Sequence, residues 1–116
     1  MRRAILIENS TGKTTRLKAR TRIGRASDNE LVLETEGTCP YHCLIWRSFF
    51  QRWYIRHIGE AVRGAGDYGC TIMKRETHVW CLLAGEASRL AEGDQIAFGR
   101  EADKEEVAFT HSFQFM

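Results

Sequence analysis

The sequence predicts an all-β domain, a sandwich or a barrel of short strands, and two observations lead to this fold class. Short runs of apolar residues, or of alternating apolar and polar residues, recur along the 116 residues, and Gly, Asn, Asp and Ser lie between them. Regular short strands separated by turn residues are typical of sandwiches and barrels. The length suits one domain with one hydrophobic core, which we expect to cover residues 1–116.

The first predicted strand, residues 4–7, precedes a polar run, ENSTGKTTRL, that contains Gly-Lys-Thr as a phosphate-binding P-loop does. The spacing argues against a P-loop, because its signature has a glycine five residues before Gly12 and this chain has Ile7 there. The residues that follow alternate in the manner of a strand. We therefore expect a hairpin with Asn-Ser-Thr-Gly as its turn, residues 14–19 as its second strand, and Lys13 facing water.

The clearest strand pair covers residues 42–46 and 53–58. Leu44 and Trp46 would share one face of their strand, and every second residue from Trp53 onward would share a face of the other. Further strands are expected at residues 22–25, 31–33, 70–73, 78–83, 95–98 and 107–115.

Two segments do not fit the strand pattern. Residues 59–68, GEAVRGAGDY, form the one long irregular stretch, and long loops in compact domains tend to be functional or mobile. Residues 86–91 could form a helical turn, but the segment is short and runs into a Gly-Asp turn signal.

Composition narrows the range of partners. The net charge is +2 with acids and bases interspersed, which is not the basic stripe of a nucleic-acid binder. No apolar run approaches the length that spans a bilayer, so neither nucleic acid nor membrane is expected as a partner. The four cysteines are expected as free thiols in a reducing, cytoplasmic setting.

Four segments, RIGRASDNELVL, CPYHCLIW, IRHIGE and LAEGDQIAFG, stand in the order and spacing of the motifs of a forkhead-associated (FHA) domain. The chain resembles this family over roughly residues 3–115. The resemblance implies a two-sheet antiparallel β-sandwich whose loops at one end bind phosphothreonine peptides, with no cofactor. An enzyme is not expected, since the sequence has no nucleophile elbow, paired carboxylates or intact P-loop.

Arg25 and His42 are the motif residues with the clearest physical roles. Arg25 matches the arginine that contacts phosphate in the family, and its planar guanidinium suits bidentate phosphate recognition. The alternative is a surface arginine paired with Asp28 or Glu30. His42 matches the histidine that braces the binding loops by hydrogen bonds. The full predicted site comprises Arg25, Ser27, Cys39, Arg63, Tyr68 and Gly69 in contact with the peptide, and Gly24, Asn29 and His42 in support.

Three residues depart from the family pattern at positions that contact the ligand. Cys39 replaces a serine that bonds phosphate, Pro40 replaces a basic residue, and Tyr68 replaces the asparagine that grips the peptide backbone. A thiol is a weak donor, and proline has neither charge nor N–H. Arg63 is the nearest candidate for a substitute cation, and the others are Arg56 and Lys74.

The departures leave a second function open, a degenerate FHA-like scaffold for phosphate-independent protein contacts or self-association. Exposure of Trp46, Phe49, Phe50 or Trp80 would favour this alternative, because exposed aromatic patches mark interfaces.

A zinc site is a third possibility that the spacing disfavours. Cys39, His42 and Cys43 lie close together in the sequence, as do His78 and Cys81, but this is not the spacing of a zinc knuckle. Neighbouring residues of a strand also point to opposite faces. No metal is therefore expected.

Overall fold

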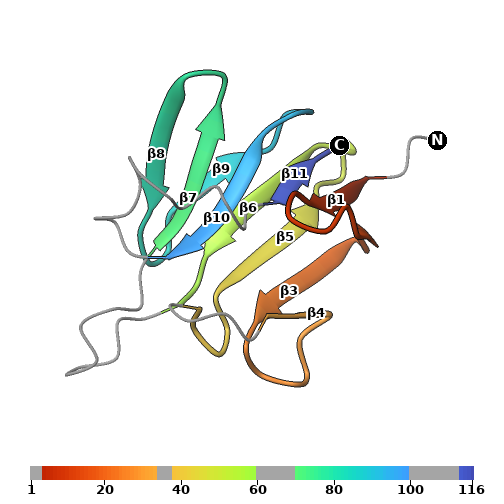
Figure 1. Ribbon diagram of the computed structural model, residues 1–116, viewed down its shortest axis with the longest axis vertical. Helices are drawn as coiled ribbons and strands as arrows, with labels where there is room; N and C mark the ends of the chain where they lie inside the picture. Colours follow the sequence, from red (N-terminus) through yellow and green to blue (C-terminus); the bar gives the residue numbers. More distant parts are fainter. Residues whose placement is uncertain (1–3, 34–37, 60–69, 100–112) are drawn as a thin grey trace.

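The structure is a computed structural model that describes residues 4–33, 38–59, 70–99 and 113–116. Its eleven strands form two sheets, which confirms the predicted all-β sandwich (Figure 1). The six-stranded sheet has the order β2 (Thr14–Arg16), β1 (Ile5–Glu8), β11 (Phe113–Phe115), β10 (Gln95–Gly99), β7 (Cys70–Arg75) and β8 (His78–Leu82). The five-stranded sheet has the order β4 (Leu31–Val32), β3 (Arg20–Gly24), β5 (Cys43–Arg47), β6 (Trp53–His57) and β9 (Ala87–Arg89).

The strand pairs are antiparallel with one exception among the described residues, because β4 lies parallel to β3. The core lies between the sheets and follows the alternation of the strands. In β5 and β6, Ile45 faces Ile55 across the ladder and both are fully buried. Leu44 and Trp46 lie on the other face of β5 and are half-buried. Leu44 and Trp46 therefore share the outer face of this sheet, as their alternation in the sequence predicts.

The N-terminal hairpin forms as predicted, but its second strand, expected at residues 14–19, ends at Arg16. Gly12 N–H donates to the Glu8 carbonyl at 2.8 Å, and Glu8 N–H donates to the Lys13 carbonyl at 2.8 Å. Gly12 has a φ of 74°, the left-handed conformation that favours glycine. Lys13 is exposed, so the Gly-Lys-Thr run is the turn and start of a hairpin.

Residues 86–91 correct one expectation. They contain no helical turn, and Ala87–Arg89 form β9, whose Ser88 pairs with Ile55 of β6. Three residues at the edge of a sheet are too few to show an alternating pattern, which is why the strand was not predicted. In the predicted strand at residues 107–115, the described part is β11, and residues 107–112 lie outside the described residues.

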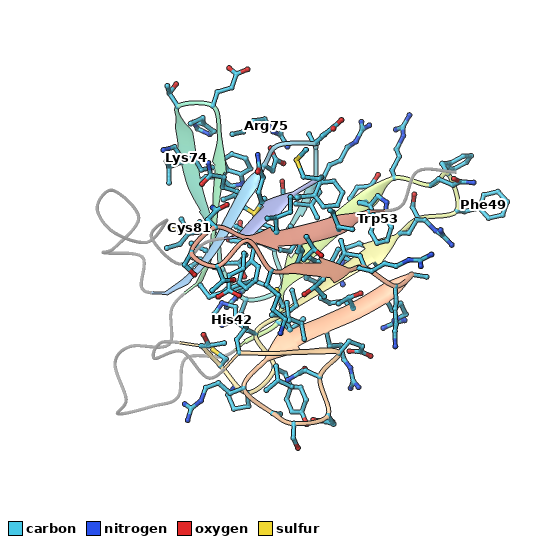
Figure 2. The ribbon with its side chains drawn as sticks, turned by 45° about the vertical axis from the view of Figure 1, so that its right-hand side comes forward. His42, Phe49, Trp53, Lys74, Arg75 and Cys81 are labelled. Atoms are coloured by element: carbon cyan, nitrogen blue, oxygen red, sulfur yellow. The ribbon has the colours of Figure 1, made fainter. Side chains whose placement is uncertain are left out.

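The long strands of the five-stranded sheet connect two opposite ends of the sandwich. The loops after β3, before β5 and after β6 meet at one end, since Ile23 pairs with Cys43 and Cys43 with His57. The β5–β6 hairpin closes the other end. Figure 2 shows the labelled His42 and Phe49 at these two ends. No helix in the described segments is long and apolar enough to cross a membrane.

Candidate functional site

The site begins where β3 ends, at a glycine that touches the next loop. A Cβ on Gly24 would lie 2.8 Å from the carbonyl carbon of Pro40 and 2.9 Å from the Cys39 carbonyl oxygen. Beyond this contact, Arg25 N–H donates to the Cys39 carbonyl at 3.0 Å, and Ala26 N–H donates to the Pro40 carbonyl at 3.1 Å. Any larger residue at position 24 would push the two loops apart, so glycine fixes their approach.

Asn29 links the same two loops through its side chain. Its Nδ2 group donates to the carbonyls of Ala26 and Pro40, both at 2.8 Å, and the residue is buried. The Oδ1 atom is buried without a hydrogen-bond partner among the described residues. Both Nδ2 protons are used within the loops, so Asn29 ties the two loops together. Its support of a peptide site stays a prediction.

A charged network that sequence reasoning missed secures the β3–β4 loop. Arg22 Nε lies 3.3 Å from Glu30 Oε2, and Arg22 Nη2 donates to the Asp28 carbonyl at 2.9 Å. The Tyr41 hydroxyl donates to Asp28 Oδ1 at 3.0 Å, and this hydrogen bond raises the pKa of Tyr41. Asp28 and Glu30, the two carboxylates considered as partners for Arg25, are thus held by Arg22 and Tyr41. Neither residue occupies a fixed motif position, so the sequence carried no signal for them.

His42 connects three strand ends. Its Nδ1 accepts from Cys39 N–H at 3.0 Å, its own N–H donates to the Ile23 carbonyl at 2.8 Å, and its carbonyl accepts from Gly59 N–H at 3.0 Å. The ring is completely buried and packs edge-on against His57 at 4.8 Å between centroids. Because Nδ1 accepts, the neutral ring carries its proton on Nε2. This is a bracing geometry, with no nucleophile or acid in these contacts.

Cys39 packs inward, towards Gly59. It is 2% exposed, and a Cβ on Gly59 would lie 2.6 Å from its sulfur, so the thiol is packed against that glycine. Burial raises the pKa of the thiol, and the charge of Arg25 opposes that rise. The thiol therefore stays protonated at neutral pH. Its contact with a peptide remains a prediction, and its burial counts against it.

The remaining predicted residues fall into two groups. Arg25 and Ser27 are exposed at the loop end of the sandwich. Tyr68, Gly69 and Arg63 lie outside the described residues.

The two other candidate cations lie on the sheets. The Arg56 guanidinium lies over the Trp46 ring at 5.4 Å, on the outer face of the five-stranded sheet. Lys74 pairs with Gln95 in the six-stranded sheet, away from His42 (Figure 2).

The structure also places the residues considered for zinc. His78 stacks on Trp80 in β8, whereas Cys43 begins β5 in the other sheet and His42 directly precedes it. Within the described ranges, no group of three or more His, Cys, Asp or Glu side chains is arranged to hold a metal ion.

Comparison with known proteins gives the family. The FHA-domain family model matches residues 21–99. No curated protein matches the chain. Among solved structures, Mycobacterium tuberculosis EmbR in complex with a low-affinity phosphopeptide is 26% identical, with a TM-score of 0.61 over 98% of this chain. The present chain spans 24% of that EmbR chain.

Two further structures share the fold at lower identity. The MEK1 FHA domain in complex with a HOP1 phosphothreonine peptide is 19% identical, with a TM-score of 0.63 and coverage of 97% of this chain and 94% of that one. The FHA domain of Chlamydia trachomatis CT664 is 16% identical, with a TM-score of 0.66 and coverage of 99% and 97%. The family match extends over most of the sandwich and includes the loops built around Gly24, Asn29 and His42. This chain therefore belongs to the FHA-domain family.

Proposed function

We propose that the chain is a non-enzymatic recognition module that binds phosphothreonine-containing peptides through the loop end of the sandwich. The observation that carries the proposal is the position of Arg25. Its side chain is exposed directly after β3, and its backbone is tied to the Cys39 carbonyl at 3.0 Å. A fixed backbone with an exposed guanidinium suits capture of a phosphate that carries roughly −1.5 to −2 charges.

The departures from the family pattern predict weak binding. A hydrogen bond to a charged group contributes about 1.5–3 kcal/mol, so the loss of one donor weakens affinity about tenfold or more. Cys39 replaces a hydroxyl donor and is buried, and Pro40 supplies neither charge nor N–H. Arg25 would then carry a larger share of the phosphate contact than its counterpart in a domain with the full set of donors.

Titration with a library of phosphothreonine peptides, each beside its unphosphorylated form, tests the proposal. We expect binding to the phosphorylated members only, and a loss of about tenfold or more for Arg25→Ala, with Arg25→Lys retaining part of the affinity. Arg52→Ala is the matched control, because Arg52 is an exposed arginine in the hairpin at the opposite end. Equal binding of phosphorylated and unphosphorylated peptides would refute the proposal.

The second candidate is the phosphate-independent scaffold, and one observation favours it. Phe49 is 94% exposed and Phe50 is 80% exposed, whereas Trp46 and Trp80 are half-buried. Two of the four aromatic residues that would mark an interface are thus open to solvent. If no phosphopeptide binds, this hairpin becomes the main candidate for contact.

A further inference from the structure

The β5–β6 turn has an ordered backbone. Gln51 N–H donates to the Ser48 carbonyl at 2.9 Å, and Ser48 N–H donates to the Arg52 carbonyl at 2.7 Å. Gln51 has a φ of 59°, in the left-handed region. These features are those of a three-residue hairpin loop, in which a type I turn is followed by a left-handed residue. Phe49 and Phe50 occupy the two central positions of that turn.

The residues in this turn are not those that the turn itself favours. Central turn positions usually carry polar residues, Gly or Pro, and the left-handed position favours Gly or Asn. Here two phenylalanines stand at the tip, and their rings contact each other edge-on at 5.5 Å between centroids. Figure 2 shows Phe49 at the outer edge of the molecule. Residues that break the preferences of a turn and gain no packing indicate a role other than stabilising the fold.

Four cations lie at the same end of the sandwich as the tip. Arg47 and Arg52 flank the turn, and Arg47 N–H donates to the Ala19 carbonyl at 2.9 Å, which brings Lys18 and Arg20 to the same end. All four side chains are exposed. Within the part of the chain that the structure describes, none of the four forms an ion pair. An apolar tip with exposed cations at the same end is complementary to a surface with negative charge outside and apolar material beneath.

We propose that the Phe49–Phe50 tip inserts into the surface of an anionic lipid bilayer, with Lys18, Arg20, Arg47 and Arg52 against the headgroups. The two rings reach the boundary between headgroups and acyl chains, where apolar groups leave water and lysines and arginines remain hydrated. This contact needs no spanning segment, so it differs from the membrane role that the sequence argues against. It goes beyond the proposed peptide binding, because the loops that carry Arg25 lie at the other end and would face away from the bilayer.

A second copy of the chain fits the tip less well. Two phenylalanines bury about 300–500 Å² together, whereas a specific interface buries about 800 Å² on each partner. Two copies meeting at their tips would also bring cations of like charge together. A hollow of about 420 Å³ beside the turn, lined by Trp53, Phe115, Arg47 and Glu92 among others, could still admit a ring from another molecule. Size-exclusion chromatography of the chain alone therefore accompanies the vesicle test and measures self-association.

The test is co-sedimentation of the chain with vesicles of phosphatidylserine and phosphatidylcholine, compared with vesicles of phosphatidylcholine alone. We expect binding to the anionic vesicles that weakens as salt screens the charges. The double variant Phe49→Ser with Phe50→Ser should lose tenfold or more in partitioning. Arg52→Ala should lose about fivefold, the share expected for one cation near an anionic surface.

Two controls keep the test independent of folding and of peptide binding. Leu83→Ser removes an apolar side chain that is 51% exposed near the loop end, and Lys13→Ala removes a cation from the β1–β2 turn. Both should bind vesicles as the unaltered chain does. The idea fails if the unaltered chain does not sediment at low salt, or if the phenylalanine variant sediments equally well. Alternatively, the unaltered chain forms a dimer that the phenylalanine variant abolishes, and fails to bind vesicles. That result would identify a second copy of the chain, and not a bilayer, as the partner of the tip. Phosphopeptide titration of the same variants does not depend on vesicle binding. Failure of the bilayer proposal can therefore be told apart from failure of the proposed peptide binding.

Discussion

At the scale of single residues, Gly24 sets the contact between the two loops of the candidate site. Replacing it with Ala would force a Cβ against the Pro40 and Cys39 carbonyl groups. We expect Gly24→Ala to lower the free energy of unfolding by about 1–3 kcal/mol through overpacking, and to weaken any peptide binding. Urea unfolding measures the first effect. Gly93→Ala is the comparison, because Gly93 has a φ of 91° but open space around its Cα, so only the strain of about 1–2 kcal/mol applies.

Asp94 provides a second residue-scale prediction. Its carboxylate is buried and accepts from Arg75 Nε and Nη2, both at 2.8 Å, and from Ala91 N–H at 2.9 Å. We expect Asp94→Asn to cost about 1.5–3 kcal/mol, since the amide cannot accept all three bonds. Glu30→Gln is the control, because both side chains of its pair with Arg22 are partly exposed, at 43% and 27%, and exposed pairs contribute about 0–1 kcal/mol. Equal changes in the urea midpoints of the two variants would show that burial does not decide the strength of these pairs.

At this scale the motif spacing predicted which residues would lie together, while their part in peptide binding stays a prediction. Gly24, Asn29 and His42 hold fixed places in motifs whose spacing brings them to one end, and the structure joins them by backbone and side-chain hydrogen bonds. Arg22 and Tyr41 were missed, because their partners depend on where loop side chains point, which spacing does not determine. The inward packing of Cys39 was missed for the same reason.

At the scale of elements, periodicity predicted the strands wherever they were long enough to show it. The run from Ala4 became β1, and the pairing of β5 with β6 followed the expected alternation. The failure at β9 has a physical cause. Its three residues form a strand because the exposed edge of β6 offers unpaired groups, a tertiary effect that no local pattern contains.

The β5–β6 hairpin carries the prediction at this scale. Gln51 holds a φ of 59°, which costs a residue with a Cβ about 1–2 kcal/mol and costs glycine almost nothing. Part of that gain is offset by the greater entropy of glycine in the unfolded chain. We expect Gln51→Gly to raise the free energy of unfolding by about 0.5–1 kcal/mol, and Gln51→Ala to leave it nearly unchanged. A lower urea midpoint for the glycine variant would contradict the left-handed assignment. Because both phenylalanines remain, vesicle binding should be preserved.

At the scale of the whole molecule, the sandwich separates two surfaces of different chemistry. One end gathers loops tied by Asn29 and His42 beside an exposed arginine, and the other presents two exposed phenylalanines among cations. Under the two proposals, a peptide at one end and a bilayer at the other would not compete, because the strands separate the two surfaces. Such a module could hold a phosphorylated partner at a bilayer, an arrangement that combines both proposals.

At the same scale, we expect the stability of the whole domain to depend on pH through the buried His57. His57 is buried, its Nδ1 lies 2.9 Å from Thr71 Oγ1, and burial lowers its pKa below the usual 6.5. As pH falls through 6.5, the unfolded chain takes up a proton at His57 before the folded chain does. The contribution of His57 to the free energy of unfolding is therefore fully present above that pH and declines below it. We expect a lower urea midpoint at about pH 5 than at about pH 7.5, where carboxylates are still ionised. His57→Gln should flatten this dependence, whereas His78→Gln, at an exposed position on β8, should preserve it. An unchanged slope in His57→Gln would assign the effect to another group.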